Sequence, residues 1–75
     1  MKRMIVYGKN YDSIFYESMG EDEGALLEEL INILKDEDTR TNLVKSGLES
    51  LKIEIKEICP HCNKEYTMKR ITEYL

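Results

Sequence analysis

Two cysteines three positions apart are the residues of this chain whose type and spacing point most directly to chemistry. They stand in the run Cys59-Pro60-His61-Cys62, and the sequence has no other cysteine. Two thiolates at this spacing on one turn can bind a single metal ion, and the N–H groups of the turn can hydrogen-bond the sulfurs. The same pair can alternatively cycle between a dithiol and a disulfide.

The residues around the pair, from Ile58 to Tyr66, resemble one knuckle of a zinc ribbon, in which a strand enters a Cys-Pro-x-Cys turn and a second strand leaves it. Asn63 stands where such knuckles usually carry glycine, and asparagine tolerates the left-handed backbone conformation. Tetrahedral zinc takes four ligands, and a ribbon supplies them from two knuckles. The resemblance therefore implies a zinc ion held by Cys59 and Cys62, with the second pair of thiolates supplied by another copy in a homodimer, as in the zinc hook of the long coiled-coil DNA-repair ATPases.

Three other uses of this turn stay open. His61, the one histidine of the chain, or a carboxylate can complete a poorer metal site, and the turn can also serve only as a β-turn. Cys-Pro-His-Cys also resembles the dithiol motif of thioredoxin-like oxidoreductases, in which the first thiol lies at a helix N-terminus that lowers its pKa. Against this redox alternative, the single proline, Pro60, lies inside the motif, so no separate cis-proline is available beside it.

Acidic residues are concentrated in one segment of the chain. The 75 residues carry a net charge of −4, but residues 17–38 hold nine acids and one lysine, a net −8, while residues 1–16 and 39–75 each carry +2. A solvated helix face is the simplest explanation of such a block. A functional explanation is a surface that docks on a basic partner or imitates nucleic acid, because such a field speeds encounter with basic surfaces. The acids expected to contact that partner are Glu21, Asp22, Glu23, Glu28, Glu29, Asp36, Glu37 and Asp38.

Size, charge and motif together predict a small, acidic, non-enzymatic interaction protein that binds or inhibits a macromolecular partner, such as a basic nucleic-acid-binding protein. Small acidic proteins of phages and mobile elements often act in this way, and the chain fits that class in size and charge. A zinc-knuckle module that binds nucleic acid directly, through the basic and aromatic residues Lys64, Tyr66, Lys69 and Arg70, is an alternative. We disfavour it because the acidic segment repels phosphate.

The first half of the chain shows a hairpin pattern followed by a helical one. Residues 3–7 and 13–17 are rich in strand-forming residues and flank a turn signal, Gly8-Lys9-Asn10, so they predict an N-terminal β-hairpin. Within residues 22–36, the apolar positions Leu27, Leu30, Ile31 and Leu34 repeat at helical spacing, and Leu26 and Ile33 widen the stripe. This pattern predicts a central amphipathic helix. Ser18 and Glu21 have capping-box spacing at its start, and the acids at 36–38 are placed unfavourably for the dipole at its end.

The second half contains one clear and one ambiguous element. Residues 39–47 predict a short helix with Gly47 in the left-handed position that ends it. In residues 50–58, apolar residues alternate with Lys52, Glu54 and Lys56, as in a half-buried strand, but the apolar positions of residues 44–62 also fit a heptad seam and one long helix. We favour the strand, because Gly47 and the β-branched residues after it disfavour a continuous helix. Residues 63–75 then complete a hairpin, although their spacing equally fits a helix.

Residues 1–75 are therefore expected to form a single small α+β domain. It has an N-terminal β-hairpin, one central amphipathic helix, a short second helix and a C-terminal hairpin that turns at the Cys-Pro-His-Cys knuckle. We expect the helix to pack its Leu27/Leu30/Ile31/Leu34 face on the sheet. No apolar run approaches the ~18 residues of a membrane helix, and no cleavage pattern follows the short basic and apolar start, which indicates a cytoplasmic protein. A chain of this size buries only about 60% of its unfolded surface, so a homodimer is also expected.

Overall fold

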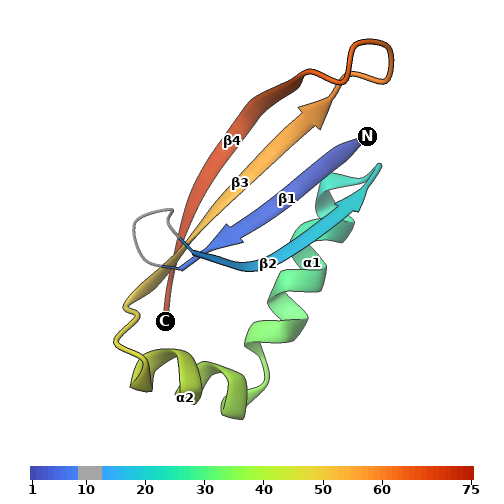
Figure 1. Ribbon diagram of the computed structural model, residues 1–75. Helices are drawn as coiled ribbons and strands as arrows, with labels where there is room; N and C mark the ends of the chain where they lie inside the picture. The colour runs from blue at the N-terminus through green and yellow to red at the C-terminus, as the bar shows by residue number, and fades with distance from the viewer. Residues whose placement is uncertain (9–12) are drawn as a thin grey trace.

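The alternating pattern at residues 50–58 forms a strand, and the heptad helix does not occur. The computed structural model describes residues 1–8 and 13–75, and Figure 1 shows their arrangement. The described elements are β1 (Lys2–Tyr7), β2 (Ile14–Gly20), α1 (Glu23–Leu34), α2 (Glu37–Lys45), β3 (Ser50–Ile58) and β4 (Glu65–Tyr74). The predicted α+β class, with its two hairpins around two helices, is confirmed. The turn predicted at residues 8–10 lies mostly outside the described residues.

The strands form one antiparallel sheet in the order β2-β1-β3-β4. β1 and β3 are neighbours although both helices separate them in sequence, and Val6 lies opposite Ile53 in their register. The two hairpins thus occupy the two halves of the sheet, β1–β2 on one side and β3–β4 on the other. Consequently β3 is a central strand with a neighbour on each edge, whereas β4 is an edge strand.

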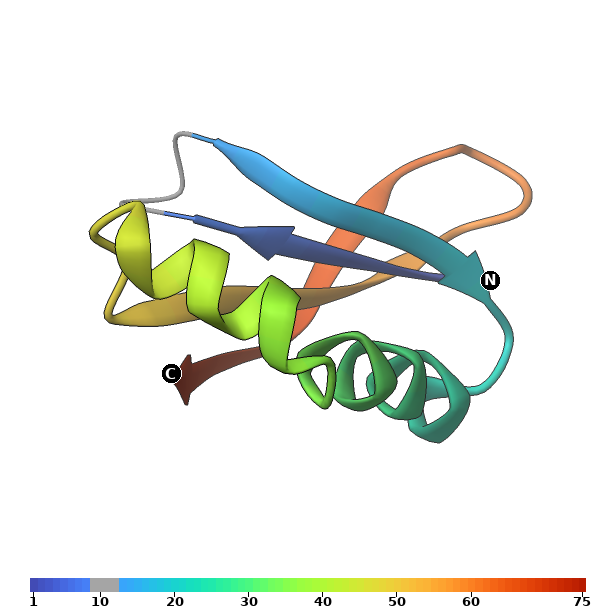
Figure 2. The same cartoon turned by 90° about the horizontal axis from the view of Figure 1, so that it is seen from below.

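The core lies between one face of this sheet and the helices, which Figure 2 shows on the same side of the strands. Side chains point alternately to the two faces of a strand, so every second residue of β1 and β3 reaches the helices. The buried cluster consists of Met4, Val6, Leu26, Leu30, Leu34, Leu43, Leu51, Ile53 and Ile55. Burial of these side chains is the main stabilising contribution in a chain of this size.

The packed face of α1 differs from the predicted one. The expected stripe contained Leu27 and Ile31, but the structure buries Leu26, Leu30 and Leu34 and leaves Ile31 53% exposed. The helix contacts β1 and β2, and it therefore turns the Leu26 side of its wide stripe toward them. The Ile31 side of the same stripe faces Ile53 of β3 and Ile71 of β4 across an open groove.

The ends of the helices are set by different residues from those predicted. Asp22 caps α1, because its side chain accepts a hydrogen bond from the Gly24 amide at 3.0 Å. The capping box expected from Ser18 does not form, since Ser18 lies in β2 and its hydroxyl donates to Glu29. The acids at 36–38 do not end α1 unfavourably either: Asp36 is the N-cap residue of α2, whose first turn they make acidic. At this position their negative charges stabilise α2, because they lie near the positive end of its dipole.

α2 spans residues 37–45, two positions earlier than predicted, because the chain turns at Lys35 and Asp36 and starts the new helix at once. Gly47 follows with a φ of +88°, which confirms its predicted left-handed conformation after the helix. No helix among the described residues is long and apolar enough to cross a lipid bilayer.

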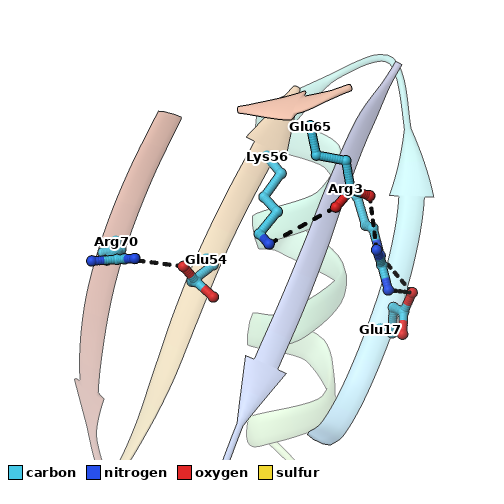
Figure 3. Close-up of polar contacts among 6 residues, drawn as sticks. All are labelled: Arg3, Glu17, Glu54, Lys56, Glu65 and Arg70. Carbon is cyan, nitrogen blue, oxygen red and sulfur yellow. Dashed lines mark hydrogen bonds and ion pairs between the residues drawn. The ribbon is translucent and has the colours of Figure 1, made fainter. Parts of the chain in front are cut away.

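The second face of the sheet is open and carries ion pairs (Figure 3). Arg3 on β1 contacts Glu17 on β2 at 2.6 Å and Glu65 on β4 at 2.8 Å, and these carboxylates raise its pKa above the usual range. On β3, Glu54 accepts a hydrogen bond from Arg70 Nε at 3.0 Å. These contacts link all four strands across a face that no helix covers.

Candidate functional site

The Cys59–Cys62 pair lies in the turn that joins β3 to β4, as predicted. The Cys59 amide donates to the Lys64 carbonyl at 2.9 Å, and the Asn63 amide donates to the Cys59 carbonyl at 3.0 Å, so the turn is closed by two backbone hydrogen bonds. Asn63 has a φ of +58°, the left-handed conformation expected from its place after the second cysteine. The backbone of the knuckle is therefore formed by local residues without help from the rest of the chain.

The Cys59 sulfur has hydrogen-bond donors within the turn. The Cys62 thiol hydrogen-bonds the Cys59 sulfur, and the backbone N–H groups of Cys62 and His61 also donate to it. These donors stabilise the thiolate, so they lower the pKa of Cys59 below its ordinary value of 9.0, in that order of importance. A lowered pKa favours the thiolate of Cys59, which is the form of cysteine that binds metal and attacks disulfides.

The knuckle is accessible at the tip of the β3–β4 hairpin, which extends beyond the ends of β1 and β2 (Figure 1). Cys59 is half-buried, Cys62 is exposed, and both are free thiols. Within residues 1–8 and 13–75, no group of three or more histidine, cysteine or acidic side chains is gathered at one point. In the described residues, neither His61 nor a carboxylate joins the two cysteines in a group of three.

The element after the knuckle is a strand and not a helix. The redox alternative places the first thiol at a helix N-terminus, where the dipole lowers its pKa. Here the residues after Cys62 continue into β4, and the pKa of Cys59 is lowered by hydrogen bonds within the turn instead. The geometry at Cys59 and Cys62 is therefore closer to the zinc-ribbon knuckle than to the dithiol motif.

Several acids that were predicted to bind a partner make contacts within the protein. Glu29 accepts hydrogen bonds from the hydroxyls of Tyr16 and Ser18, which attaches α1 to β2, and the pKa of Tyr16 is raised by this contact. Glu23 pairs with Lys69 of β4 at 3.1 Å, and Asp22 caps α1. Sequence alone does not distinguish such acids from free ones, because their partners are distant in the chain.

Two further acids of the predicted set also have contacts nearby. Asp36 accepts a hydrogen bond from the Thr39 hydroxyl at 2.8 Å, and Glu21 lies 3.7 Å from the N-terminal amine of Met1. In the described part of the chain, Glu28, Glu37 and Asp38 are exposed and form neither an ion pair nor a side-chain hydrogen bond. The acidic surface available to a partner is thus smaller than the charge of residues 17–38 indicates.

The basic and aromatic residues after the knuckle do not form one patch. Lys69 contacts Glu23 of α1, on the helix-covered face, whereas Arg70 contacts Glu54 on the open face. Neighbouring residues of a strand point to opposite faces, so these two cations are separated by the sheet. Lys64 lies in the turn and Tyr66 is exposed near the start of β4.

An apolar groove lies between α1 and the β3–β4 half of the sheet, and we call it the α1–β4 groove. It has a volume of about 320 Å³ and an apolar lining formed by Leu27, Leu30, Ile31 and Leu34 of α1 with Ile53 and Ile71 of the strands. It exists because α1 packs on β1 and β2. The inner side chains of β3, Leu51, Ile53 and Ile55, are buried in the core, but the inner face of β4 is only partly covered. In the sequence, the width of the apolar stripe in residues 22–36 indicates this second apolar surface, because the stripe is wider than one packed face needs.

The charged residues at the groove are Lys35, Arg40 and Glu73. Lys35 follows α1 and Arg40 lies in α2, so both cations stand near the C-terminal end of α1. Neither cation pairs with an acid elsewhere in residues 1–8 and 13–75. The groove therefore combines an apolar floor with two cations and one carboxylate, and none of these three forms an ion pair in the described residues.

Comparison of the chain with models of known protein families, with curated proteins and with solved structures finds no match.

Proposed function

We propose that this chain is a non-enzymatic interaction protein that binds, and thereby can inhibit, a macromolecular partner, and that its α1–β4 groove accepts an amphipathic helix of that partner. The observation that carries the proposal is the uncovered apolar surface between α1 and β4. Ile31 is the most exposed of its apolar residues, at 53%. A contiguous exposed apolar surface of this kind is typical of protein interaction sites.

The dimensions favour a helix as the occupant. Neighbouring strands lie about 4.8 Å apart, so β4 lies two strand spacings from β1, on which α1 packs, and this separation is close to the ~10 Å diameter of a helix. α1 packs on β1 and β2 and leaves the inner face of β4, beside the buried side chains of β3, for a second helix. An amphipathic helix that inserts apolar side chains at positions i, i+3, i+4 and i+7 binds such grooves in general.

Charge specifies the occupant further. Lys35 and Arg40 are unpaired at one end of the groove, so the bound helix is expected to place a carboxylate there. An ion pair of this kind contributes more to specificity and to the association rate than to affinity. The partner segment is therefore an amphipathic helix with an aspartate or glutamate beside its apolar face.

Selection of peptides on the purified protein tests this proposal. A random 16-residue peptide library is selected on the wild-type chain, and enriched peptides are synthesised and titrated by fluorescence anisotropy. Enriched peptides should show the amphipathic spacing with an acidic residue, and Ile31→Glu should weaken their binding at least tenfold. Ile14→Glu is the matched control, because Ile14 is 54% exposed on β2 and lies away from the groove.

Two results would contradict this function. If selection enriches no such pattern, or if Ile31→Glu and Ile14→Glu weaken peptide binding equally, the groove is not the docking surface. Both variants add a charge at a position that is already half-exposed, so neither is expected to unfold the chain. Circular dichroism of each variant checks this expectation before the titrations.

A second candidate is the predicted acidic contact with a basic nucleic-acid-binding protein. The exposed and unpaired acids Glu28, Glu37 and Asp38 support it, since a partner can neutralise them without breaking internal contacts. Proteins captured by the wild-type chain from a lysate are identified, purified and tested one by one against the variant Glu28→Lys/Glu37→Lys/Asp38→Lys. This candidate requires that a captured basic protein loses affinity for the triple variant, and unchanged affinity removes it. We place either activity in the cytoplasm, where the free thiols of the knuckle stay reduced.

A further inference from the structure

We propose that two copies of this chain bind one zinc ion between their β3–β4 hairpin tips, each copy supplying the Sγ atoms of Cys59 and Cys62. The inference is independent of the α1–β4 groove, which lies away from the tip between α1 and the strands. It concerns the assembly of the protein, whereas the groove concerns its partner.

The first argument is the arrangement of the two sulfurs. Two ligands of a tetrahedral zinc ion at Zn–S distances near 2.3 Å stand about 3.8 Å apart. The turn that carries both cysteines is closed by the backbone hydrogen bonds from the Cys59 amide to the Lys64 carbonyl, at 2.9 Å, and from the Asn63 amide to the Cys59 carbonyl, at 3.0 Å, so the two thiols are held on one short turn. Zinc replaces the thiol proton between them without a change in the backbone of the knuckle.

The second argument is the set of donors to the sulfur. The N–H groups of His61 and Cys62 both point at Cys59 Sγ. A zinc ion with four thiolates carries a net charge of −2, and N–H groups directed at the sulfurs spread that charge. A turn that only reverses the chain needs no such donors to a side chain, so this arrangement favours a metal ligand over a bare β-turn.

The third argument is the number of ligands. Structural zinc is almost always bound by four protein ligands, and the sequence contains only these two cysteines. In the described residues no third side chain joins them. A second copy brings the same preformed pair, so two knuckles together supply the complete four-thiolate set.

The fourth argument is the position and charge of the tip. The turn extends beyond β1, β2 and α1 in Figure 1, so two tips can meet head to head while the bodies of the two copies stay apart. The charged residues that flank the knuckle are Lys64, which offsets the negative zinc cluster, Glu57, which pairs with the Met1 amine and Lys2, and Glu65, which is held by Arg3 and Lys56.

Binding is a proton-for-metal exchange. Four thiols bind one Zn²⁺, four Zn–S bonds form and four protons pass to solvent, with no change in oxidation state. The product is a dimer whose stability depends on metal concentration, because zinc binds the assembled pair of knuckles and shifts the equilibrium by mass action.

The test uses the full chain, reduced and freed of metal, and titrated with zinc chloride. Light scattering after size-exclusion chromatography should show a change from the 8.8 kDa monomer to twice that mass, with about half a zinc per chain by elemental analysis. EDTA should restore the monomer. Cobalt(II) in place of zinc should give the visible absorption of a tetrahedral four-thiolate site. The visible absorption of cobalt(II) depends on its ligands and geometry, whereas zinc does not absorb visible light.

Variants separate this site from its alternatives. Cys59→Ser and Cys62→Ser should each abolish zinc binding and zinc-dependent dimer formation, whereas His61→Ala should change neither. All three residues lie in the turn at the hairpin tip, so these substitutions are not expected to unfold the sheet. A monomer with one zinc per chain, a dimer that persists in EDTA and reductant, or a chain that binds no zinc would each overturn the proposal.

Failure here is distinguishable from failure of the proposed function. Peptide binding by the α1–β4 groove is measured in EDTA, where the knuckle holds no metal, and zinc binding is measured without any peptide. Ile31→Glu should leave zinc binding unchanged, and Cys59→Ser should leave peptide binding unchanged.

Discussion

Replacing Arg70 with methionine should destabilise the protein through the burial of Glu54. The Glu54 side chain is only 7% exposed, and it accepts hydrogen bonds from Arg70, at 3.0 Å, and from the Tyr7 phenol. Arg70→Met keeps the apolar part of the side chain but removes the cation, so a buried carboxylate loses its charged partner. Removal of one partner of a buried pair is costly because the other charge stays desolvated.

The magnitude follows from the exposure of each partner. A hydrogen bond to a charged group contributes about 1.5–3 kcal/mol, and Arg70 is 66% exposed, so solvent screening places this contact near the lower limit. We therefore expect a loss of about 1.5 kcal/mol in the free energy of unfolding, which in a domain of this size lowers Tm by roughly 6–12 °C. Urea denaturation and thermal melting followed by circular dichroism measure both quantities.

The pH dependence of the stability difference between wild type and Arg70→Met tests whether Glu54 is its cause. Burial opposes ionisation of Glu54, but the hydrogen bonds from Arg70 and Tyr7 outweigh it and lower its pKa below the ordinary 4.5. A carboxyl with a lowered folded-state pKa contributes stability that is present above its unfolded-state pKa and is lost as pH falls through the folded-state value. The difference between wild type and Arg70→Met should therefore be full at pH 7 and shrink as pH falls below about 4.5.

A neighbouring ion pair supplies the control. Lys69 pairs with Glu23 on the opposite face, where the Glu23 side chain is 30% exposed. Lys69→Met should cost no more than about 0.5 kcal/mol, because an exposed pair is largely screened. Equal costs for the two methionine variants, or a difference for Arg70→Met that is the same at pH 3 and pH 7, would refute the role assigned to Glu54.

Three further predictions concern the core, the knuckle and the attachment of α1. Leu30→Ala should lower the free energy of unfolding by about 3 kcal/mol in urea denaturation, because Leu30 is buried in the core and the truncation leaves a cavity. Asn63→Ala should cost about 1 kcal/mol, since alanine is strained at a φ of +58°, whereas Asn63→Gly should be close to neutral in the same assay. Tyr16→Phe should lower stability by about 1 kcal/mol at pH 7, through the lost hydrogen bond to Glu29. The raised pKa of Tyr16 favours its neutral form in the folded state, so the difference between wild type and Tyr16→Phe should disappear as pH rises past 10 and through the raised value.

The sequence predicts those parts of the molecule whose cause is local. The knuckle depends on two cysteines, a proline and an asparagine within five residues, and it forms in the place and with the left-handed Asn63 that were expected. α1 follows from the helical spacing of its leucines, and the strand at residues 50–58 follows from alternation. Each of these signals lies within a few residues of the structure that it produces, so no distant contact is needed to interpret it.

The tertiary structure decides what depends on which elements become neighbours. Alternation predicts that Glu54 is exposed, and it is buried because β3 lies between β1 and β4, where Tyr7 and Arg70 enclose it. The charge of residues 17–38 predicts one acidic surface, but Glu29 and Glu23 are used to attach α1 to β2 and to pair with β4. In both cases the deciding partner is more than ten residues away in the chain.

The α1–β4 groove illustrates the same division within a single helix. Sequence determines that α1 has an apolar stripe too wide for one contact, from Leu26 to Ile33. Only the packing of α1 on β1 and β2 decides that Leu26 enters the core while Ile31 lies at the open groove beside β4. The physical reason is that hydrophobic burial is non-directional, so a wide stripe has several equally apolar orientations, and the sheet selects one of them.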